Sequence, residues 1–255
     1  MIIDKIELAD VFDYLNTLDD ESIDLAIIDP PYNLNKGEWD SFESFDVFLD
    51  FTKKYLEMVC KKLKKTGSLY IFNTPFNSAF ILAILQNDLK MVYQNWIVWH
   101  KKDGFSPSKK RYVNNQETIL FFTKTKNYRF NCDDVRVPYS STDRIAAAVD
   151  KGIIKNGRRW FPNPNGKLCT DVWEFSSVRH TNKVKGKVIK QVHPTPKPEL
   201  MIERMIKASS KEGDVVLDLF SGTGTTAYVA KKLNRHYTGC ENKQEYYAII
   251  EERLK

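Results

Sequence analysis

A carboxylate, two prolines and an aromatic ring stand together at residues 29–32, directly behind an apolar run. That run, residues 23–28, is typical of a buried parallel strand, and the two prolines prevent it from continuing. The chain therefore leaves the sheet at the carboxyl end of a strand, where open α/β sheets bind ligands. Asp29 and the carbonyl of Pro30 can accept two N–H bonds there, and Tyr32 can stack on a ring face. This set suits a planar molecule that carries an exocyclic amino group.

A second apolar strand runs into a glycine-rich turn at residues 215–226. Gly222 and Gly224 allow a tight turn that a ligand can approach closely, and the first amides of the next helix are unpaired donors. Glu241 follows about 20 residues later, at the end of the next strand, where an acidic residue can hold ribose hydroxyls. The third glycine of a dinucleotide fingerprint is missing. The glycines alone therefore leave a nicotinamide enzyme and a simple chain reversal open as alternatives.

The segments between the two motifs alternate between strand and helix patterns. Such alternation predicts a doubly wound, mostly parallel sheet, with right-handed crossovers that place helices on both faces. The predicted helices are residues 11–18, 45–63, 79–85, 198–208, 227–233 and 244–254, and the predicted strands include 23–28, 68–72, 95–99, 117–123 and 236–240.

Residues 129–192 differ in character from the parts before and after them. Proline and glycine interrupt them repeatedly, and aromatic residues stand between the interruptions, which predicts an inserted irregular module between two half-domains, 1–128 and 193–255. Residues 129–197 hold 14 Lys and Arg against six Asp and Glu, whereas the rest of the chain has a net charge of −2. A phosphate backbone is one partner for this excess, and a solvated, loop-rich face is the alternative.

The two motifs also resemble those of a known family. Residues 29–32 are similar to the D-P-P-Y signature of amino-methyltransferases, and residues 218–224 resemble the D-x-F-x-G-x-G cofactor loop of DNA methyltransferases. The order of target loop, basic insertion and cofactor loop is similar to the beta class, in which the sheet is circularly permuted. Residues 67–76, 95–99, 117–122 and 193–198 extend the likeness over nearly the whole chain.

The resemblance implies a type II restriction–modification adenine-N6 methyltransferase with a seven-stranded, Rossmann-like sheet and S-adenosylmethionine as cofactor. Lys197 is expected near the methionine end of the cofactor, although Pro196 replaces the usual glutamine beside it and a surface lysine is the alternative. Asp10 is expected at the cofactor adenine, although it also suits a helix N-cap. The implied catalytic residues are Asp29, Pro30, Pro31 and Tyr32, and the implied cofactor-binding residues are Asp10, Lys197, Asp218, Phe220, Ser221, Gly222, Gly224, Thr225 and Glu241.

Double-stranded DNA is the implied substrate, with the target adenine flipped out of the duplex. Residues 158–166 and 171–177 are closely similar to relatives with an asymmetric, purine-rich site of the GAAGA type. A homodimer and a separately encoded restriction endonuclease are implied by the same resemblance. The predicted DNA-binding residues are Lys109, Lys110, Arg111, Arg158, Arg159, Arg179, Lys183 and Lys185.

Three other functions remain open. N4-cytosine methylation uses the same geometry, but its enzymes more often have Ser at the position of Asp29. Methylation of RNA or of a protein glutamine amide is a second alternative, and a nucleic-acid-binding module without activity is a third.

Some function classes are disfavoured by composition. The four cysteines show no C-x-x-C pairing and no metal spacing with the four histidines, so reduced thiols and no metal site are expected. The first residues have no signal-peptide pattern and no apolar run approaches membrane-spanning length, so a cytoplasmic location is expected.

Overall fold

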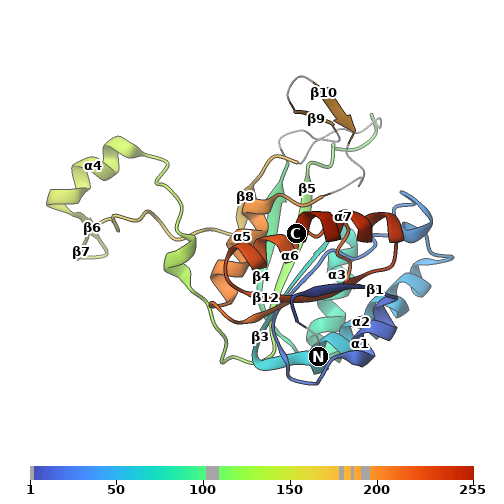
Figure 1. Ribbon diagram of the computed structural model, residues 1–255. Coiled ribbons are helices and arrows are strands. Elements are labelled where there is room, and N and C mark those ends of the chain that lie inside the picture. Colours follow the sequence, from blue (N-terminus) through green and yellow to red (C-terminus); the bar gives the residue numbers. More distant parts are fainter. Residues whose placement is uncertain (1–2, 102–108, 178–180, 185–186, 191–195) are drawn as a thin grey trace.

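A central sheet of eight strands organises the part of the chain that the computed structural model describes, residues 3–101, 109–177, 181–184, 187–190 and 196–255 (Figure 1). The order is β1-β12-β11-β2-β3-β5-β4-β8, and β5 is the one strand of this sheet that runs antiparallel to its neighbours. The strands are β1 (Lys5–Leu8), β2 (Ile23–Ile28), β3 (Leu63–Asn73), β4 (Val92–His100), β5 (Gln116–Thr123), β8 (Val172–Glu174), β11 (Val215–Asp218) and β12 (His236–Glu241).

The predicted mostly parallel sheet is confirmed, with one strand more than the seven expected. The additional strand is β8, which pairs in parallel with β4 although it comes from the segment predicted to be irregular. Trp173 at its centre is buried, whereas Val172 and Glu174 on either side are exposed. Three residues are too few for this alternation to be recognised in a sequence.

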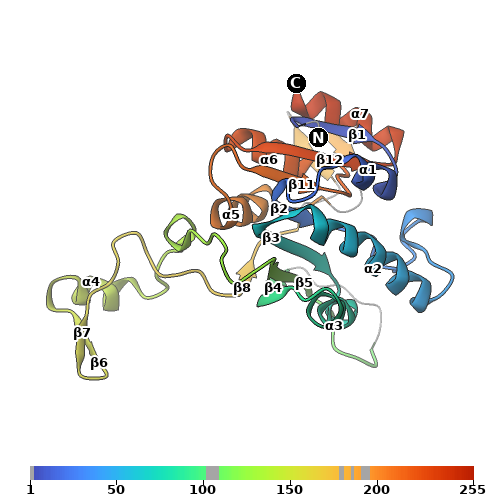
Figure 2. The same ribbon diagram turned by 90° about the horizontal axis from the view of Figure 1, so that it is seen from below.

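Helices cover both faces of the sheet, as the alternating pattern predicts (Figure 2). One face packs against α1 (Val11–Thr17), α2 (Phe45–Lys62) and α3 (Pro75–Ala83), and the other against α5 (Glu199–Ser209), α6 (Thr225–Lys232) and α7 (Gln244–Leu254). Helix α3 begins four residues before the predicted helix because Thr74 caps it, accepting from the Asn77 N–H, and proline occupies its first position. Three short helices complete this part: η1 (Glu38–Asp40), η2 (Ile84–Asp88) and η3 (Cys132–Val135).

The first strand and the last helix lie side by side, as a permuted sheet requires (Figure 2). Strand β1 pairs in parallel with β12, from Lys5 opposite Thr238 to Leu8 opposite Glu241. The amino-terminal strand thus completes the half of the sheet that carries the glycine-rich turn. None of the helices in the described residues combines the length and apolar character needed to cross a bilayer.

An arm extends from the body and consists of α4 (Thr142–Lys151) and a hairpin of β6 (Ile153–Lys155) and β7 (Arg158–Trp160) (Figures 1 and 2). Asn156 and Gly157 form the hairpin turn with φ of 51° and 72°, as a tight two-residue turn requires. A second hairpin joins β9 (Thr181–Val184) to β10 (Lys187–Lys190). The segment predicted to be irregular therefore contains a ten-residue helix and two hairpins.

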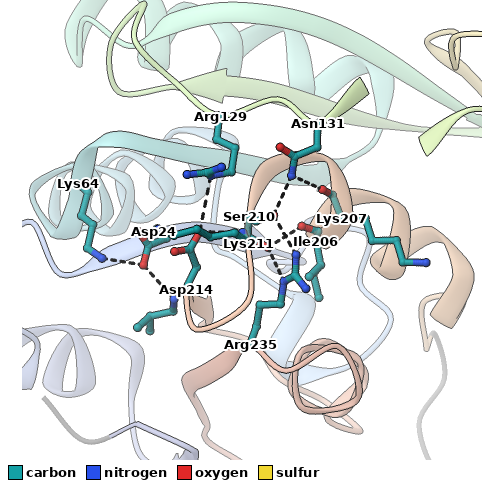
Figure 3. Close-up of polar contacts among 11 residues, drawn as sticks. Asp24, Lys64, Arg129, Asn131, Ile206, Lys207, Ser210, Lys211, Asp214 and Arg235 are labelled. Atoms are coloured by element: carbon teal, nitrogen blue, oxygen red, sulfur yellow. Dashed lines mark hydrogen bonds and ion pairs between the residues drawn. The ribbon is translucent and has the colours of Figure 1, made fainter. Parts of the chain in front are cut away.

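A polar network fixes the chain where it leaves β5 for the arm (Figure 3). The Asn131 side chain donates to the carbonyls of Lys207 and Ser210 at 2.8 and 2.9 Å, which ties it to the end of α5. Arg235 donates to the same Ser210 carbonyl at 2.9 Å. Asp24 accepts from Lys64 Nζ at 2.7 Å and also from the Val215 N–H, so that β2, β3 and β11 are joined at their amino-terminal ends. These hydrogen bonds therefore fix the chain at the point where the arm begins.

Candidate active site

The two sequence motifs meet at one cavity of about 280 Å³, although they lie far apart in the chain. The carboxyl ends of β1, β2, β11 and β12 surround it, because parallel strands end at the same edge of a sheet. The predicted residues that line the cavity are Asp10, Asp29, Pro30, Pro31, Tyr32, Lys197, Phe220, Gly222 and Glu241.

The loop after β2 owes its shape to a buried carboxylate, Asp40, that sequence reasoning missed. Asp40 Oδ1 accepts from the Tyr32 N–H at 2.6 Å, and Oδ2 accepts from the N–H groups of Leu34 and Lys36 at 3.0 and 3.2 Å. From the other side, Asn77 Nδ2 donates to the Tyr32 carbonyl at 2.7 Å. The backbone of Tyr32 is thus held at both its donor and its acceptor.

A connected set of charged and polar side chains lies beside this loop. Asp29 Oδ1 accepts from the Tyr32 hydroxyl at 2.8 Å, and Asp29 Oδ2 lies 2.6 Å from Lys197 Nζ. Glu117 Oε2 lies 3.2 Å from the same hydroxyl and 3.7 Å from the same ammonium group. Lys101 pairs with the other oxygen of Glu117. Two carboxylates and the Lys197 ammonium group therefore surround the phenol, and Lys101 adds a second cation on Glu117.

Burial and charge fix the protonation of this set. Burial raises the pKa of Tyr32 well above its usual value, and the carboxylates of Asp29 and Glu117 raise it further, so the phenol remains a donor. Burial alone would lower the pKa of Lys197, but Asp29 and Glu117 outweigh it and raise the pKa. Burial alone would raise the pKa of Glu117, but Lys197 and Lys101 outweigh it and lower the pKa. Lys197 and Glu117 are therefore both charged at neutral pH.

Glu117 reaches the cavity because β5 runs antiparallel to the neighbouring strands. Glu117 stands near the beginning of β5, and in an antiparallel strand the beginning lies at the edge where parallel strands end. A parallel β5 would have carried Glu117 to the opposite edge. The signal in the sequence was a glutamate at the head of an apolar strand, a position that needs a charged partner.

The cofactor half of the cavity offers two carboxylates and aromatic walls. Glu241 accepts from the Gly222 N–H at 2.8 Å and from the Lys243 N–H at 2.9 Å, which ties the glycine turn to the end of β12. Asp10 accepts from the Phe12 N–H at 2.8 Å and caps α1, and the residue also lines the cavity. The N-cap role of Asp10 is therefore compatible with the predicted contact to the cofactor adenine.

Four residues predicted to bind the cofactor lie behind the lining. Asp218 accepts from the Phe220 N–H at 3.2 Å, and Ser221 Oγ donates to the Asp218 carbonyl at 3.2 Å. The Gly224 N–H closes the turn on the Ser221 carbonyl at 2.7 Å, with a φ of 72° that favours glycine. Thr225 Oγ1 accepts from Arg253 at 3.1 Å. In the structure these residues shape the turn, and their direct contact with a cofactor stays a prediction.

The lining fits S-adenosylmethionine. Glu241 lines the cavity and burial raises its pKa, so this carboxylate would be stabilised by donors and cations that a ligand brings. Ribose hydroxyls, an amino group and a sulfonium centre would supply both. Phe220 and Tyr246 line the same space and offer apolar surfaces to an adenine ring.

The predicted DNA-binding residues are spread over several parts of the chain. Lys109, Lys110 and Arg111 are exposed on the connection between β4 and β5, at the same edge as the cavity. Arg158 and Arg159 are exposed on β7, and the arm projects from the β8 side, away from α1 and α2 (Figure 2). Lys183 belongs to β9, whereas Arg179 and Lys185 lie outside the described residues.

Comparison with known proteins gives matches over most of the chain. The sequence model of the DNA methylase family that covers N6 and N4 methyltransferases matches residues 23–252. The type II methyltransferase M1.MboII of Moraxella bovis is 57% identical over 96% of this chain and 94% of its own length. The type II methyltransferase M.HpaI of Haemophilus parainfluenzae is 39% identical over 94% of this chain and 70% of its own length.

Solved structures show the same fold. The cytosine-N4-specific PvuII DNA methyltransferase superposes with a TM-score of 0.75 at 20% identity, over 98% of this chain and 86% of the other. A complex of M1.HpyAVI with S-adenosylmethionine gives a TM-score of 0.61 at 23% identity, over 98% of both chains.

Proposed function

Since this chain belongs to the N6/N4 DNA methylase family and is an S-adenosylmethionine-dependent type II DNA methyltransferase, we propose that it methylates the N6 amino group of adenine in double-stranded DNA. The observation that supports this proposal is the place of Asp29 and Pro30. Both line the cavity that Gly222 and Glu241 also line, so an amino group held by the first pair would lie beside a cofactor held by the second.

The loop residues have a definite task in this reaction, because an adenine amino group is a poor nucleophile whose lone pair is delocalised into the ring. S-adenosylmethionine, when bound, supplies a methyl group made electrophilic by the sulfonium centre. Asp29 and the Pro30 carbonyl would accept the two N–H bonds, turn the lone pair out of conjugation, and stabilise the positive charge that develops on nitrogen. Holding both reactants in line can contribute about 7–11 kcal/mol to the acceleration.

The Tyr32 ring is restricted in its movement and is not an exposed ring that could freely adjust to stack on a base. Its side chain is only 7% exposed and its hydroxyl is held by Asp29 and Glu117, while the residue lines the cavity. A flipped base that entered the cavity would meet this ring, and stacking would return about 1–3 kcal/mol of the cost of flipping. Pro31 keeps the backbone before Tyr32 rigid.

Asp29 is the feature that favours adenine over cytosine, since N4-cytosine enzymes more often have Ser at this position. We propose an asymmetric, purine-rich target of the GAAGA type, read by the module of residues 129–192 between the catalytic half (1–128) and the cofactor half (193–255). The biological role would be protection of host DNA in the cytoplasm against a separately encoded endonuclease. A homodimer is part of this proposal.

Identification of the methylated nucleoside tests the proposal. Duplex DNA incubated with the protein and labelled S-adenosylmethionine is digested and analysed by mass spectrometry, and N6-methyladenine is the expected product. N4-methylcytosine would refute the adenine assignment, and an unmodified digest would favour a module that only binds nucleic acid.

The Asp29→Ala variant tests the role of Asp29 in turnover. It should lose at least about 100-fold in turnover, because removal of one preorganised charge-stabilising group costs roughly that much. Its affinity for S-adenosylmethionine, measured by calorimetry, should persist. Normal turnover by this variant would contradict the role of Asp29.

A further inference from the structure

Both oxygens of the Asp29 carboxylate are already occupied by donors of the protein itself. The Tyr32 hydroxyl holds Oδ1 at 2.8 Å and Lys197 Nζ holds Oδ2 at 2.6 Å. A target amino group has to form its own hydrogen bond with this carboxylate, within a buried loop whose backbone is fixed by Asp40 and Asn77. Each oxygen of a carboxylate can accept two hydrogen bonds, so a target amino group would share an oxygen of Asp29 with one of the present donors unless that donor moves to another acceptor.

Glu117 is an acceptor that both donors can reach. Its Oε2 lies 3.2 Å from the Tyr32 hydroxyl and 3.7 Å from Lys197 Nζ, so movements of an ångström or less would transfer either donor. Glu117 is 9% exposed, and Lys101 holds its other oxygen from the far side. Lys101 in turn lies over the Trp99 ring, 4.5 Å from its centroid. Glu117 is therefore anchored rather than free to swing.

Charge balance favours such an exchange. Lys197 is 9% exposed, and a buried ammonium group that loses its only counter-ion is strongly destabilised. If Lys197 left Asp29 without another carboxylate at hand, the binding of the base would carry that cost. With Glu117 beside it, Lys197 can exchange its ion pair with Asp29 for one with Glu117 and keeps a carboxylate partner throughout.

We propose that Glu117 is a positioning residue that takes over Lys197 and the Tyr32 hydroxyl as the target amino group binds, and so frees the Asp29 carboxylate for that amino group. The inference rests on the proposed function. It assigns to Glu117 no contact with the reacting atoms, and it makes base capture, rather than cofactor binding, the step that depends on this residue.

The test replaces Glu117 with glutamine, which keeps the shape and an acceptor oxygen but removes the charge that balances Lys197. Turnover of Glu117→Gln should fall by about 10- to 100-fold, as expected when a catalytic group is misplaced by about an ångström. Fluorescence of 2-aminopurine placed at the target position should report less flipped base in this variant. The affinity for S-adenosylmethionine should stay within about twofold of the wild type, since Glu117 acts on base capture only.

Two further variants separate positioning from a merely structural role. Glu117→Asp keeps the charge and should recover part of the turnover and of the flipping signal, and it also serves if the glutamine variant fails to fold. Glu57→Gln removes an exposed carboxylate on α2 and should match the wild type in every measurement.

The outcomes are distinguishable. Unchanged turnover and flipping in Glu117→Gln would overturn the inference, and so would a parallel loss of cofactor affinity, which would indicate general damage to the fold. All three variants are compared with a wild-type protein already shown to produce N6-methyladenine. A wild type that methylates another base or none refutes the proposed function instead.

Discussion

Asp218 is a residue whose burial opposes folding at neutral pH. It is 6% exposed, and burial raises its pKa from 3.8 to about 7. Between pH 3.8 and about 7, Asp218 is protonated in the folded protein and ionised in the unfolded chain. The stability that this group contributes is therefore present below pH 4 and is lost as the pH rises through 7.

We predict that Asp218→Asn removes this loss of stability with rising pH. An asparagine side chain can still accept from the Phe220 N–H but does not ionise, so the variant should gain stability relative to the wild type as the pH rises from 5 to 8. The gain would be a few kcal/mol at most, at about 1.4 kcal/mol for each unit of pKa shift. Urea denaturation at pH 5, 6, 7 and 8 measures it. A constant difference between the two proteins across this range would contradict the assigned pKa.

Residues that are neighbours in sequence were predictable, and residues that meet across the fold were not. The motif at residues 29–32 and the pair Gly222 and Glu241 each carry a local pattern, a strand followed by a particular turn, and the structure places both at one cavity. Asp40 and Glu117 have no such pattern. Their roles depend on the fold of a loop and on the direction of β5, which no local spacing encodes.

The loop after β2 is the element on which the candidate active site depends. Asp40 accepts three of its N–H groups, from Tyr32, Leu34 and Lys36, and is 1% exposed. These hydrogen bonds keep the loop in a conformation that includes Asn33 and Asn35 with positive φ. Since all three N–H donors share one carboxylate acceptor, a single substitution removes the three hydrogen bonds together.

We predict that Asp40→Ala lowers turnover by more than about 10-fold and lowers the melting temperature by several degrees, because each buried donor left without an acceptor costs about 1–3 kcal/mol. Cofactor affinity should change little, since Gly222 and Glu241 are held by their own hydrogen bond. Steady-state kinetics, thermal unfolding and calorimetry measure the three effects. Asp40→Asn keeps one acceptor oxygen and should be intermediate, and turnover equal to the wild type in both variants would refute the role of Asp40.

The strongly patterned elements were predicted well, whereas short ones were not. Helix α2 ends within one residue of its predicted range and α7 matches its range, because each has several turns and a clear apolar stripe. Strand β8 has three residues and helix α4 buries only Ala148 among its described side chains. Strand β8 is too short to show an alternation, and α4 lies in a segment whose prolines and glycines predicted an irregular module.

At the scale of the whole molecule, two groups of predicted DNA-binding residues lie far apart. Lys109, Lys110 and Arg111 lie at the edge of the sheet that carries the cavity, and Arg158 and Arg159 lie on the projecting arm (Figure 2). Under the proposed function, a duplex that delivers a flipped base to the cavity would pass the first group. The arm can add contacts to the backbone or bases at a distance from that base, which is the geometry expected of a recognition module.

We predict that the double variant Arg158→Ala and Arg159→Ala weakens DNA binding and lowers its dependence on salt, because each lost phosphate contact lowers the slope of log K against log salt by about 1. Fluorescence anisotropy with labelled duplex at several salt concentrations measures both quantities. Cofactor affinity should remain at the wild-type value, since the arm does not line the cavity. The matched control is Lys61→Ala with Lys65→Ala, which removes two exposed charges near the amino-terminal end of β3 and should leave the slope unchanged. If the arginine pair and the lysine pair give the same slope, the arm does not contact the phosphate backbone, and the contacts must be made by other predicted DNA-binding residues, such as Lys109, Lys110 and Arg111.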